Sequence, residues 1–147
     1  MPKAFTGKIV KADLTRKKIR VEELREGFYK TFLGGYGLGA KIIYSEIKPG
    51  VDPLGPENVF GLTTGILTGT LTPSSGSFTA VGKSPLTGTW GDSRAGGFWG
   101  PELKSAGYDA VFVFGKSEKP VYLLIKDDEV KVMDASDLWG QDTLHTE

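Results

Sequence analysis

The middle third of the sequence, residues 49–100, combines abundant glycine with almost no charge. Ten glycines fall between Gly61 and Gly100, and five of the 52 residues are charged: Asp52, Glu57, Lys83, Asp92 and Arg94. This composition is typical of a flexible linker, but the stretch also contains large apolar residues that a linker does not keep. They are Phe60, Leu62, Leu67, Phe78, Val81, Leu86, Trp90, Phe98 and Trp99. We therefore expect ordered loops whose backbone, rather than whose side chains, faces a ligand.

The remaining composition excludes several classes of protein. The 147 residues suit one domain, which can bury roughly 70% of its unfolded surface. The absence of cysteine excludes thiolate zinc sites, self-contained iron–sulfur clusters and thiol nucleophiles, and the single His145 excludes multi-histidine metal sites. A net charge of zero argues against a nucleic-acid binder. Short apolar runs and an N-terminus without an apolar segment predict a cytoplasmic protein without a membrane span.

Regular elements are expected on both sides of this stretch. Period-2 alternation predicts a hairpin from strands 8–14 and 18–24, and helical spacing predicts helices over 25–33 and 38–47. Two strands are expected within the stretch, at 58–64 and 77–82, and three more after it, at 109–114, 120–125 and 129–133. Pro101 favours a short helix that ends at Gly107, and 134–139 is expected to form a helical turn. Residues 142–147 resemble a helix that stops in its first turn, which suggests the front piece of a longer protein.

Two short motifs resemble nucleotide-binding sequences. Gly35-Tyr36-Gly37-Leu38-Gly39-Ala40 satisfies the dinucleotide pattern, but a helix rather than a strand is expected before it. We interpret these glycines as a helix cap and a tight corner between two helices. Gly82-Lys83-Ser84 and Gly115-Lys116-Ser117 resemble the end of a phosphate-binding loop, but the first glycine of that motif is replaced by Ser77 and Ala110.

One tetrapeptide occurs twice. Leu67-Thr68-Gly69-Thr70 and Leu86-Thr87-Gly88-Thr89 are identical, and each leads into a loop rich in serine and glycine. Two similar turns that present two similar loops would suit a ligand with two similar halves.

Arg94 is the only arginine of the neutral stretch, and it lies among Gly91, Gly96 and Gly97. Backbone N–H groups in such loops cradle anions, and an arginine adds a bidentate contact to phosphate. The alternative is an ordinary surface arginine in a turn, and the residues alone favour neither interpretation.

Six segments carry a family resemblance: 51–58, 67–70, 83–88, 91–100, 102–110 and 115–122. The most specific is Gly91-Asp92-Ser93-Arg94-Ala95-Gly96-Gly97-Phe98-Trp99-Gly100. In these segments, which cover nearly the whole chain in order, the sequence resembles the N-terminal domain of the aldehyde ferredoxin oxidoreductases.

The resemblance implies an enzyme that oxidises aldehydes to carboxylic acids at tungsten, or at molybdenum in some relatives. Two pterins hold the metal, and electrons pass through a 4Fe–4S cluster to ferredoxin. The first domain is expected to be the base under the cofactor, while later domains bring the cluster cysteines. The 147-residue chain alone is therefore expected to be inactive. Its implied partners are the remaining domains of the enzyme, ferredoxin and a small-molecule aldehyde; a homodimer is compatible with the resemblance, and neither nucleic acid nor membrane is implied.

The same resemblance assigns cofactor-binding residues and no catalytic residue. The implied contacts to the pterin phosphates are Ser77, Arg94, Ala95, Gly96 and Gly97, and the backbone carbonyl of Arg94 is the implied ligand of a bridging magnesium ion. Ser77 stands where some members have an arginine, and Arg94 stands where many have an asparagine. Arg94 is therefore a candidate to replace the charge missing at Ser77. Tyr36 also differs from the arginine common at that position.

The expected fold class is α+β, with two mostly antiparallel sheets and short helices that form a base for the cofactor. The alternative function is a stand-alone, non-catalytic binding or scaffold module with the same fold. A downstream reading frame with clustered cysteines would favour the enzyme.

Overall fold

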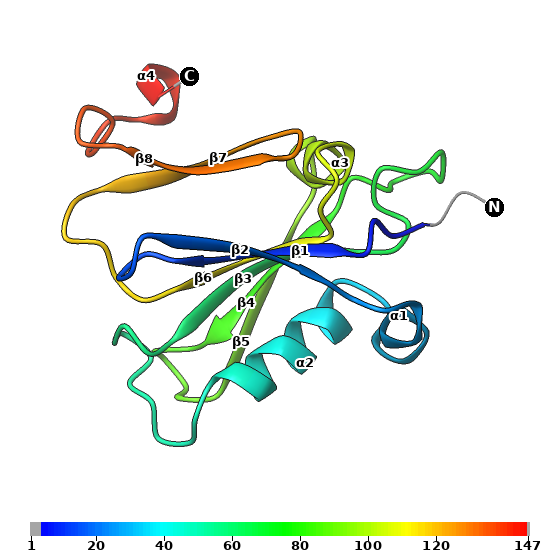
Figure 1. The fold of residues 1–147 in the computed structure, drawn as a ribbon, viewed down its shortest axis with the longest axis horizontal. Coiled ribbons are helices and arrows are strands. Elements are labelled where there is room, and N and C mark those ends of the chain that lie inside the picture. The colour runs from blue at the N-terminus through cyan, green and yellow to red at the C-terminus, as the bar shows by residue number, and fades with distance from the viewer. Residues whose placement is uncertain (1–3, 147) are drawn as a thin grey trace.

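The computed structural model describes residues 4–146 (Figure 1). The strands are β1 (Lys8–Asp13), β2 (Lys18–Glu23), β3 (Val59–Thr64), β4 (Phe78–Lys83), β5 (Trp90–Ala95), β6 (Ala110–Phe114), β7 (Val121–Lys126) and β8 (Glu129–Asp134). The helices are α1 (Glu26–Phe32), α2 (Tyr36–Glu46), α3 (Trp99–Ser105) and α4 (Thr143–Thr146). No helix in the described part of the chain is long and apolar enough to cross a membrane.

Two sheets form the frame of the domain. The larger has the order β2-β1-β6-β3-β4-β5, and the smaller is the hairpin β7–β8. All neighbouring strands are antiparallel except β1 and β6, which run parallel. The expected α+β class with two mostly antiparallel sheets is confirmed.

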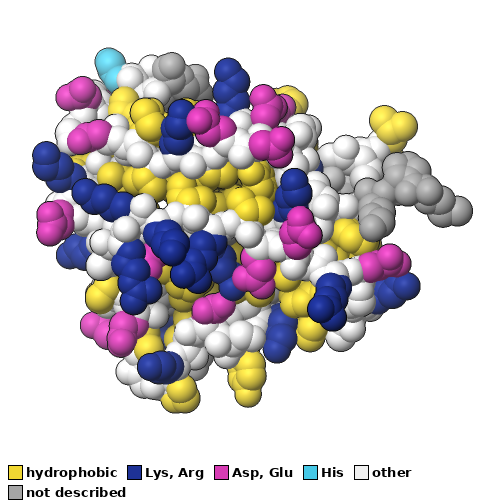
Figure 2. Space-filling view, in the orientation of Figure 1, with side chains coloured by type: hydrophobic (Ala, Val, Ile, Leu, Met, Phe, Trp, Pro, Cys, Tyr) yellow, Lys and Arg dark blue, Asp and Glu magenta, His cyan; other side chains and the backbone are white. Residues whose placement is uncertain are grey.

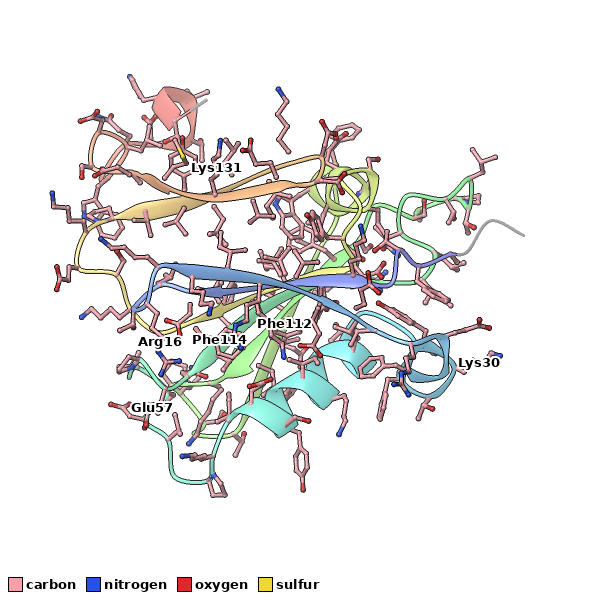
Figure 3. All side chains as sticks on the ribbon, viewed as in Figure 1. Arg16, Lys30, Glu57, Phe112, Phe114 and Lys131 are labelled. Carbon is pink, nitrogen blue, oxygen red and sulfur yellow. The ribbon has the colours of Figure 1, made fainter. Side chains whose placement is uncertain are left out.

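The elements form three layers, and the core lies on both faces of the large sheet. Helices α1 and α2 cover one face, where Ile9, Leu38 and Phe112 are fully buried. The hairpin β7–β8 and helix α3 lie over the other face, against Val10 and Val111. Ile9 and Val10 are consecutive residues of β1 and point to opposite faces, as strand geometry requires. Figure 3 shows Phe112 on the central strand between these layers.

The pattern-based expectations hold for the regular elements, with small shifts at their ends. Helix α3 begins at Trp99, so Pro101 occupies its first turn rather than its first position. Proline is tolerated there because the first N–H groups of a helix have no intrahelical acceptor. Residues 136–140 form the expected turn, in which the N–H groups of Leu138 and Trp139 both donate to the carbonyl of Ala135. The helix expected from 142 begins at Thr143, while Glu147 lies outside the described residues.

Strand β5 is the main departure from expectation. The sequence predicted loops after β4, including residues 93–97, whereas Trp90–Ala95 pairs in full register with β4. Trp-Gly-Asp-Ser-Arg-Ala has neither alternation nor β-branched residues, so its local pattern does not indicate a strand. The ladder with β4 fixes it instead, and β5 is an exposed edge of the sheet.

A buried carboxylate joins the N-terminal segment to the helices α1 and α3. Asp109 is 1% exposed, and it accepts hydrogen bonds from the backbone N–H groups of Thr6 and Gly7. The Tyr29 hydroxyl donates to it at 2.6 Å, and the Lys104 ammonium group pairs with it at 2.7 Å. Burial by itself would raise the pKa of Asp109, but the hydrogen bonds from Lys104 and Tyr29 and the charge of Lys104 hold it below its ordinary value.

This lowered pKa predicts how stability depends on acid. The ionised Asp109 stabilises the fold fully above its unfolded-state pKa of about 3.9, and this contribution disappears as the pH falls through the lower folded-state pKa. We expect the free energy of unfolding of wild type minus that of Asp109→Asn to shrink between about pH 5 and pH 2. Denaturant titrations at several pH values measure this difference. A difference independent of pH would show that the pKa of Asp109 is the same in the folded and unfolded chain, which contradicts this account.

Candidate functional site

The structure brings the five proposed cofactor contacts together at one end of strands β4 and β5. Ser77 directly precedes β4, Arg94 and Ala95 end β5, and Gly96 and Gly97 follow. The Arg94 Nη2 group donates to the Ser77 hydroxyl oxygen at 3.0 Å. Arg94 and Ala95 therefore lie in a strand rather than in the expected loop, with Arg94 opposite Thr79.

The two serine- and glycine-rich segments, residues 73–77 and 94–97, approach each other closely at this end. A Cβ atom added at Gly76 would lie 2.6 Å from the carbonyl oxygen of Gly97, so only glycine permits this packing. Gly97 has a φ of 118°, a conformation that favours glycine. A Cβ atom added at Gly96 would meet nothing within 4 Å, so Gly96 faces open space.

A pocket of about 560 Å³ opens beside these segments. Arg94 and Ser77 line one side, the corner Gly34–Gly37 lines another, and residues 65–68 and 72–75 complete the wall. The expected interpretation of the glycine corner is confirmed. Helix α1 ends at Phe32, and a Cβ atom at Gly37 would lie 1.9 Å from the Phe32 carbonyl oxygen. Tyr36 begins α2 at the pocket wall.

The groups that face this pocket are donors suited to an anion. Its lining contains the guanidinium of Arg94 and several hydroxyl groups but no carboxylate. Within residues 4–146, no group accepts a hydrogen bond from the backbone N–H groups of residues 74–77, of which Ser74, Ser75 and Ser77 line the pocket. The same holds for residues 96–98, which are not part of the lining. Loop N–H groups of this kind form anion-binding concavities, and an arginine strengthens the site with charge-assisted bonds. The donor set therefore fits the phosphate groups of a pterin cofactor.

The donor set gives less support to a cation. Among the residues that the structure describes, no group of three or more histidine, aspartate or glutamate side chains is placed to hold a metal ion. The Asp92 carboxylate, on the same strand as Arg94, already accepts the Trp90 Nε1–H at 2.6 Å. The magnesium contact through the Arg94 carbonyl stays a prediction.

The repeated tetrapeptide does not form a matched pair around one pocket. Residues 67–70 lie near the start of β4 at the glycine-lined pocket, whereas 86–89 form the turn between β4 and β5. The six residues of β4 separate them by about 20 Å. The loops that follow the two turns do meet, through Gly76 and Gly97.

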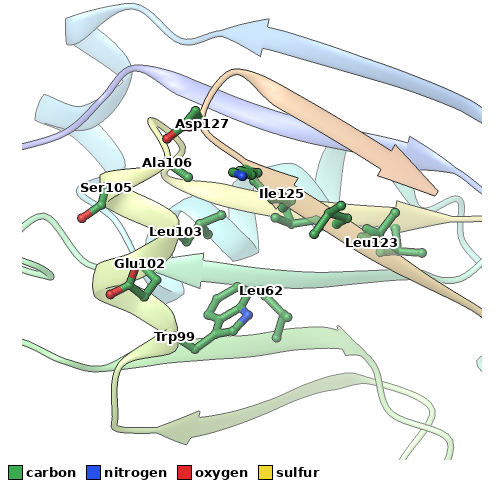
Figure 4. A pocket seen from close by; sticks show the side chains of 13 residues that line it. Leu62, Trp99, Glu102, Leu103, Ser105, Ala106, Leu123, Ile125 and Asp127 are labelled. Carbon is green, nitrogen blue, oxygen red and sulfur yellow. The ribbon is translucent and has the colours of Figure 1, made fainter. Parts of the chain in front are cut away.

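Two other hollows have a different chemistry. A pocket of about 860 Å³ between α2 and the β4–β5 turn is lined by Lys41, Tyr44, Lys48 and Trp90 among others. A pocket of about 530 Å³ lies between α3 and β7, where Leu103, Leu123 and Ile125 give it an apolar wall (Figure 4). Figure 2 shows hydrophobic side chains exposed along the line between the β7–β8 hairpin and the large sheet. Neither of these pockets is lined by Gly34–Gly37 or Gly65, which line the pocket beside Arg94.

Sequence reasoning missed Thr68, which is 6% exposed and holds the loop from Gly65 to Ser77. Thr68 belongs to the repeated tetrapeptide, but nothing in the sequence distinguishes the buried Thr68 from the exposed Thr87 in the second copy. Asp109 was likewise missed, because a single acidic residue at the start of a strand carries no pattern.

The chain is similar to known proteins over its whole length. A sequence model of the family described as "Aldehyde ferredoxin oxidoreductase, N-terminal domain" matches residues 9–147. The tungsten-containing aldehyde ferredoxin oxidoreductases of Pyrococcus furiosus and Thermococcus kodakarensis are 45% and 46% identical over 141 residues, 96% of this chain. The aliphatic sulfonate oxidoreductase, WOR-like subunit, of Pyrococcus furiosus is 42% identical over 140 residues, 93% of this chain.

A solved structure has the same fold as this chain. The solved active-site complex BamBC of benzoyl coenzyme A reductase, bound to 1,5-dienoyl-CoA, matches 99% of this chain with a TM-score of 0.95 and 38% identity. The chain spans less than a quarter of the proteins it matches: 23% of the two aldehyde oxidoreductases, 22% of the sulfonate enzyme and 22% of the benzoyl-CoA reductase chain. By sequence and by fold, the chain belongs to the N-terminal domain family of the aldehyde ferredoxin oxidoreductases.

Proposed function

We propose that this chain is the N-terminal domain of a tungsten-containing oxidoreductase, where it holds the phosphate ends of a bis-pterin cofactor. The observation that supports this most is that the Arg94 guanidinium lines one pocket with Ser74, Ser75 and Ser77, whose backbone N–H groups have no acceptor among the described residues. A phosphate group placed there would receive both charge and directional hydrogen bonds. Among the described residues that line the pocket, none is a carboxylate that would repel the phosphate.

These hydrogen-bond donors indicate which tasks belong to the protein and which to the cofactor. When bound, the cofactor supplies the two-electron oxidation of an aldehyde to a carboxylic acid, while the protein binds and orients it. Arg94 and the loop amides bind phosphate, and the rigid corner at Gly34–Gly37 fixes one wall of the pocket. We further propose that residues outside this chain bind the 4Fe–4S cluster and the aldehyde, that ferredoxin accepts the electrons, and that the enzyme is cytoplasmic.

The geometry supports a replacement of charge between two positions. Ser77 stands where some family members have an arginine, and the Arg94 guanidinium reaches the Ser77 hydroxyl from the next strand. The positive charge beside Ser77 therefore comes from a side chain of β5 rather than from a residue of the loop before β4. We infer that Arg94 takes over the electrostatic role of the arginine missing at 77.

The names of the similar proteins refer to aldehydes, to a sulfonate and to a coenzyme A compound. Because all of them share this domain, we infer that the domain holds the cofactor and does not select the substrate. An aldehyde substrate is therefore the part of the proposal that needs a direct assay.

Metal and pterin content of the longer enzyme tests the proposed role of the loops. Arg94→Ala removes a charged hydrogen-bond donor worth about 1.5–3 kcal/mol, so cofactor occupancy should fall. Gly96→Val should lower it further, because the side chain would occupy the open space that the phosphate needs. Both variants should keep the thermal stability of the cofactor-free form, since Arg94 is exposed and Gly96 has no neighbours.

Arg16→Ala is the matched control, because Arg16 is also exposed and, among the described residues, forms an ion pair only with Asp13 at the end of β1. Its cofactor content should equal that of wild type. Full occupancy in both Arg94→Ala and Gly96→Val would remove this loop from the site.

A further inference from the structure

The two copies of Leu-Thr-Gly-Thr adopt similar turns in different surroundings. Gly69 and Gly88 have φ values of 75° and 68°, and each turn leads into one of the approaching segments. The threonines differ, because Thr68 is 6% exposed whereas Thr87 lies on the surface. The tetrapeptide therefore forms a turn in both places, but only the first copy also buries its threonine side chain.

Thr68 closes the loop that forms one wall of the glycine-lined pocket. Its hydroxyl accepts a hydrogen bond from the Gly65 N–H at 3.0 Å and donates to the Ser77 carbonyl at 2.8 Å. Its methyl group faces the start of α3, where a Cβ atom at Gly100 would lie 3.0 Å from it. One buried side chain thus ties both ends of the loop to each other and to α3.

The residues that Thr68 fixes are the ones that meet the second segment. Ser77, whose carbonyl accepts from Thr68, uses its hydroxyl to accept from Arg94. Gly76, its neighbour, packs against Gly97. Ser77 therefore connects the loop that Thr68 holds with the Arg94 guanidinium, and its neighbour Gly76 connects the same loop with Gly97.

We propose that Thr68 is a positioning residue for the anion site. It touches no ligand, but its hydroxyl holds the Gly65–Ser77 loop in the arrangement that presents the amides of 74–77 and the guanidinium of Arg94 together. Most residues of this loop are glycine, serine, threonine or proline, and Leu67 and Leu71 are exposed, so the loop has little apolar packing of its own. The buried pair of hydrogen bonds made by Thr68 takes the place of a core. The inference rests on the proposed function, since the ligand is the phosphate of that proposal.

Three variants separate the hydroxyl from the rest of the side chain. Thr68→Val keeps the shape and removes the hydroxyl, Thr68→Ser keeps the hydroxyl, and Thr87→Val makes the same change in the exposed copy. Inorganic pyrophosphate is the probe, titrated into the 147-residue chain and followed by amide chemical shifts. We expect Thr68→Val to weaken pyrophosphate binding about tenfold, and Thr68→Ser and Thr87→Val to bind as wild type does.

Hydrogen exchange of the Gly65 amide measures, without any ligand, whether the hydrogen bond from Gly65 to the Thr68 hydroxyl is present. This amide should exchange faster in Thr68→Val and stay protected in Thr68→Ser and Thr87→Val. If Thr68→Val does not fold, Thr68→Ala, which leaves room for water at the Ser77 carbonyl, undergoes the same two measurements.

Each combination of results has one meaning. Wild-type binding together with unchanged binding in the Thr68 variant overturns the positioning role and leaves the proposed function standing. Absence of pyrophosphate binding in wild type overturns the proposed function, while loss of Gly65 protection in the variant would still support Thr68 as the residue that fixes the loop. Equal protection of Gly65 in all variants overturns the positioning role whatever binds.

Discussion

Replacing Asp109 by alanine should lower the free energy of unfolding by about 3–5 kcal/mol, because it breaks a buried ion pair by removing one partner. The Lys104 ammonium group, whose side chain is 9% exposed, would lose its countercharge. The Tyr29 hydroxyl and the backbone N–H groups of Thr6 and Gly7 would lose their acceptor. Because these groups come from the N-terminal segment, α1 and α3, the loss would loosen three parts of the fold together.

Denaturant unfolding of wild type and variant measures this loss, and Asp128→Ala is the control. Asp128 has a 95% exposed side chain and lies 3.8 Å from Lys8, so its removal should change stability by less than about 0.5 kcal/mol. A loss below about 1 kcal/mol for Asp109→Ala would show that the network contributes little to the fold.

Adding one methyl group at two helical glycines should shift stability in opposite directions. Gly37→Ala should destabilise the chain by at least about 2 kcal/mol, because its Cβ atom would lie 1.9 Å from the Phe32 carbonyl oxygen and the backbone must move. Gly27→Ala should stabilise it by about 0.5–1 kcal/mol, because a Cβ atom there meets nothing and alanine is the better helix former.

The two midpoints of urea unfolding test this pair, with circular dichroism as the signal. Opposite shifts would establish that the glycine corner between α1 and α2 exists for close packing. A Gly37→Ala variant as stable as wild type would contradict this account of the Gly35–Ala40 motif.

Local patterns were sufficient for most of the regular structure. Strong alternation, as in Lys18–Glu23, and helical spacing before Gly34-Gly35 predicted elements that the structure contains, although most side chains of Lys18–Glu23 are exposed. Strand β5 could not be found this way, since its six residues have no apolar face and gain their conformation from β4. Its identity as a strand is a tertiary property.

The candidate site was predicted in part. Glycine content and Arg94 indicated the stretch that contributes to the glycine-lined pocket, and the family resemblance selected Ser77 and residues 94–97. Their role as cofactor contacts stays a prediction. The sequence could not show which of these residues lie close together in space. Arg94 donates a hydrogen bond to Ser77 from the neighbouring strand, and Gly76 packs against Gly97. It also could not separate Thr68 from Thr87, because burial depends on α3, which is distant in sequence.

A crystal structure of the proposed longer enzyme with its cofactor bound tests the proposed site most directly. Anomalous scattering at the tungsten edge locates the metal, and the density around it locates the phosphates. We predict phosphate oxygens within hydrogen-bond distance of the Arg94 guanidinium and of backbone amides in 74–77 and 96–98. A cofactor whose phosphates touch neither segment, and instead occupy the lysine-lined pocket beside α2, would contradict the assignment.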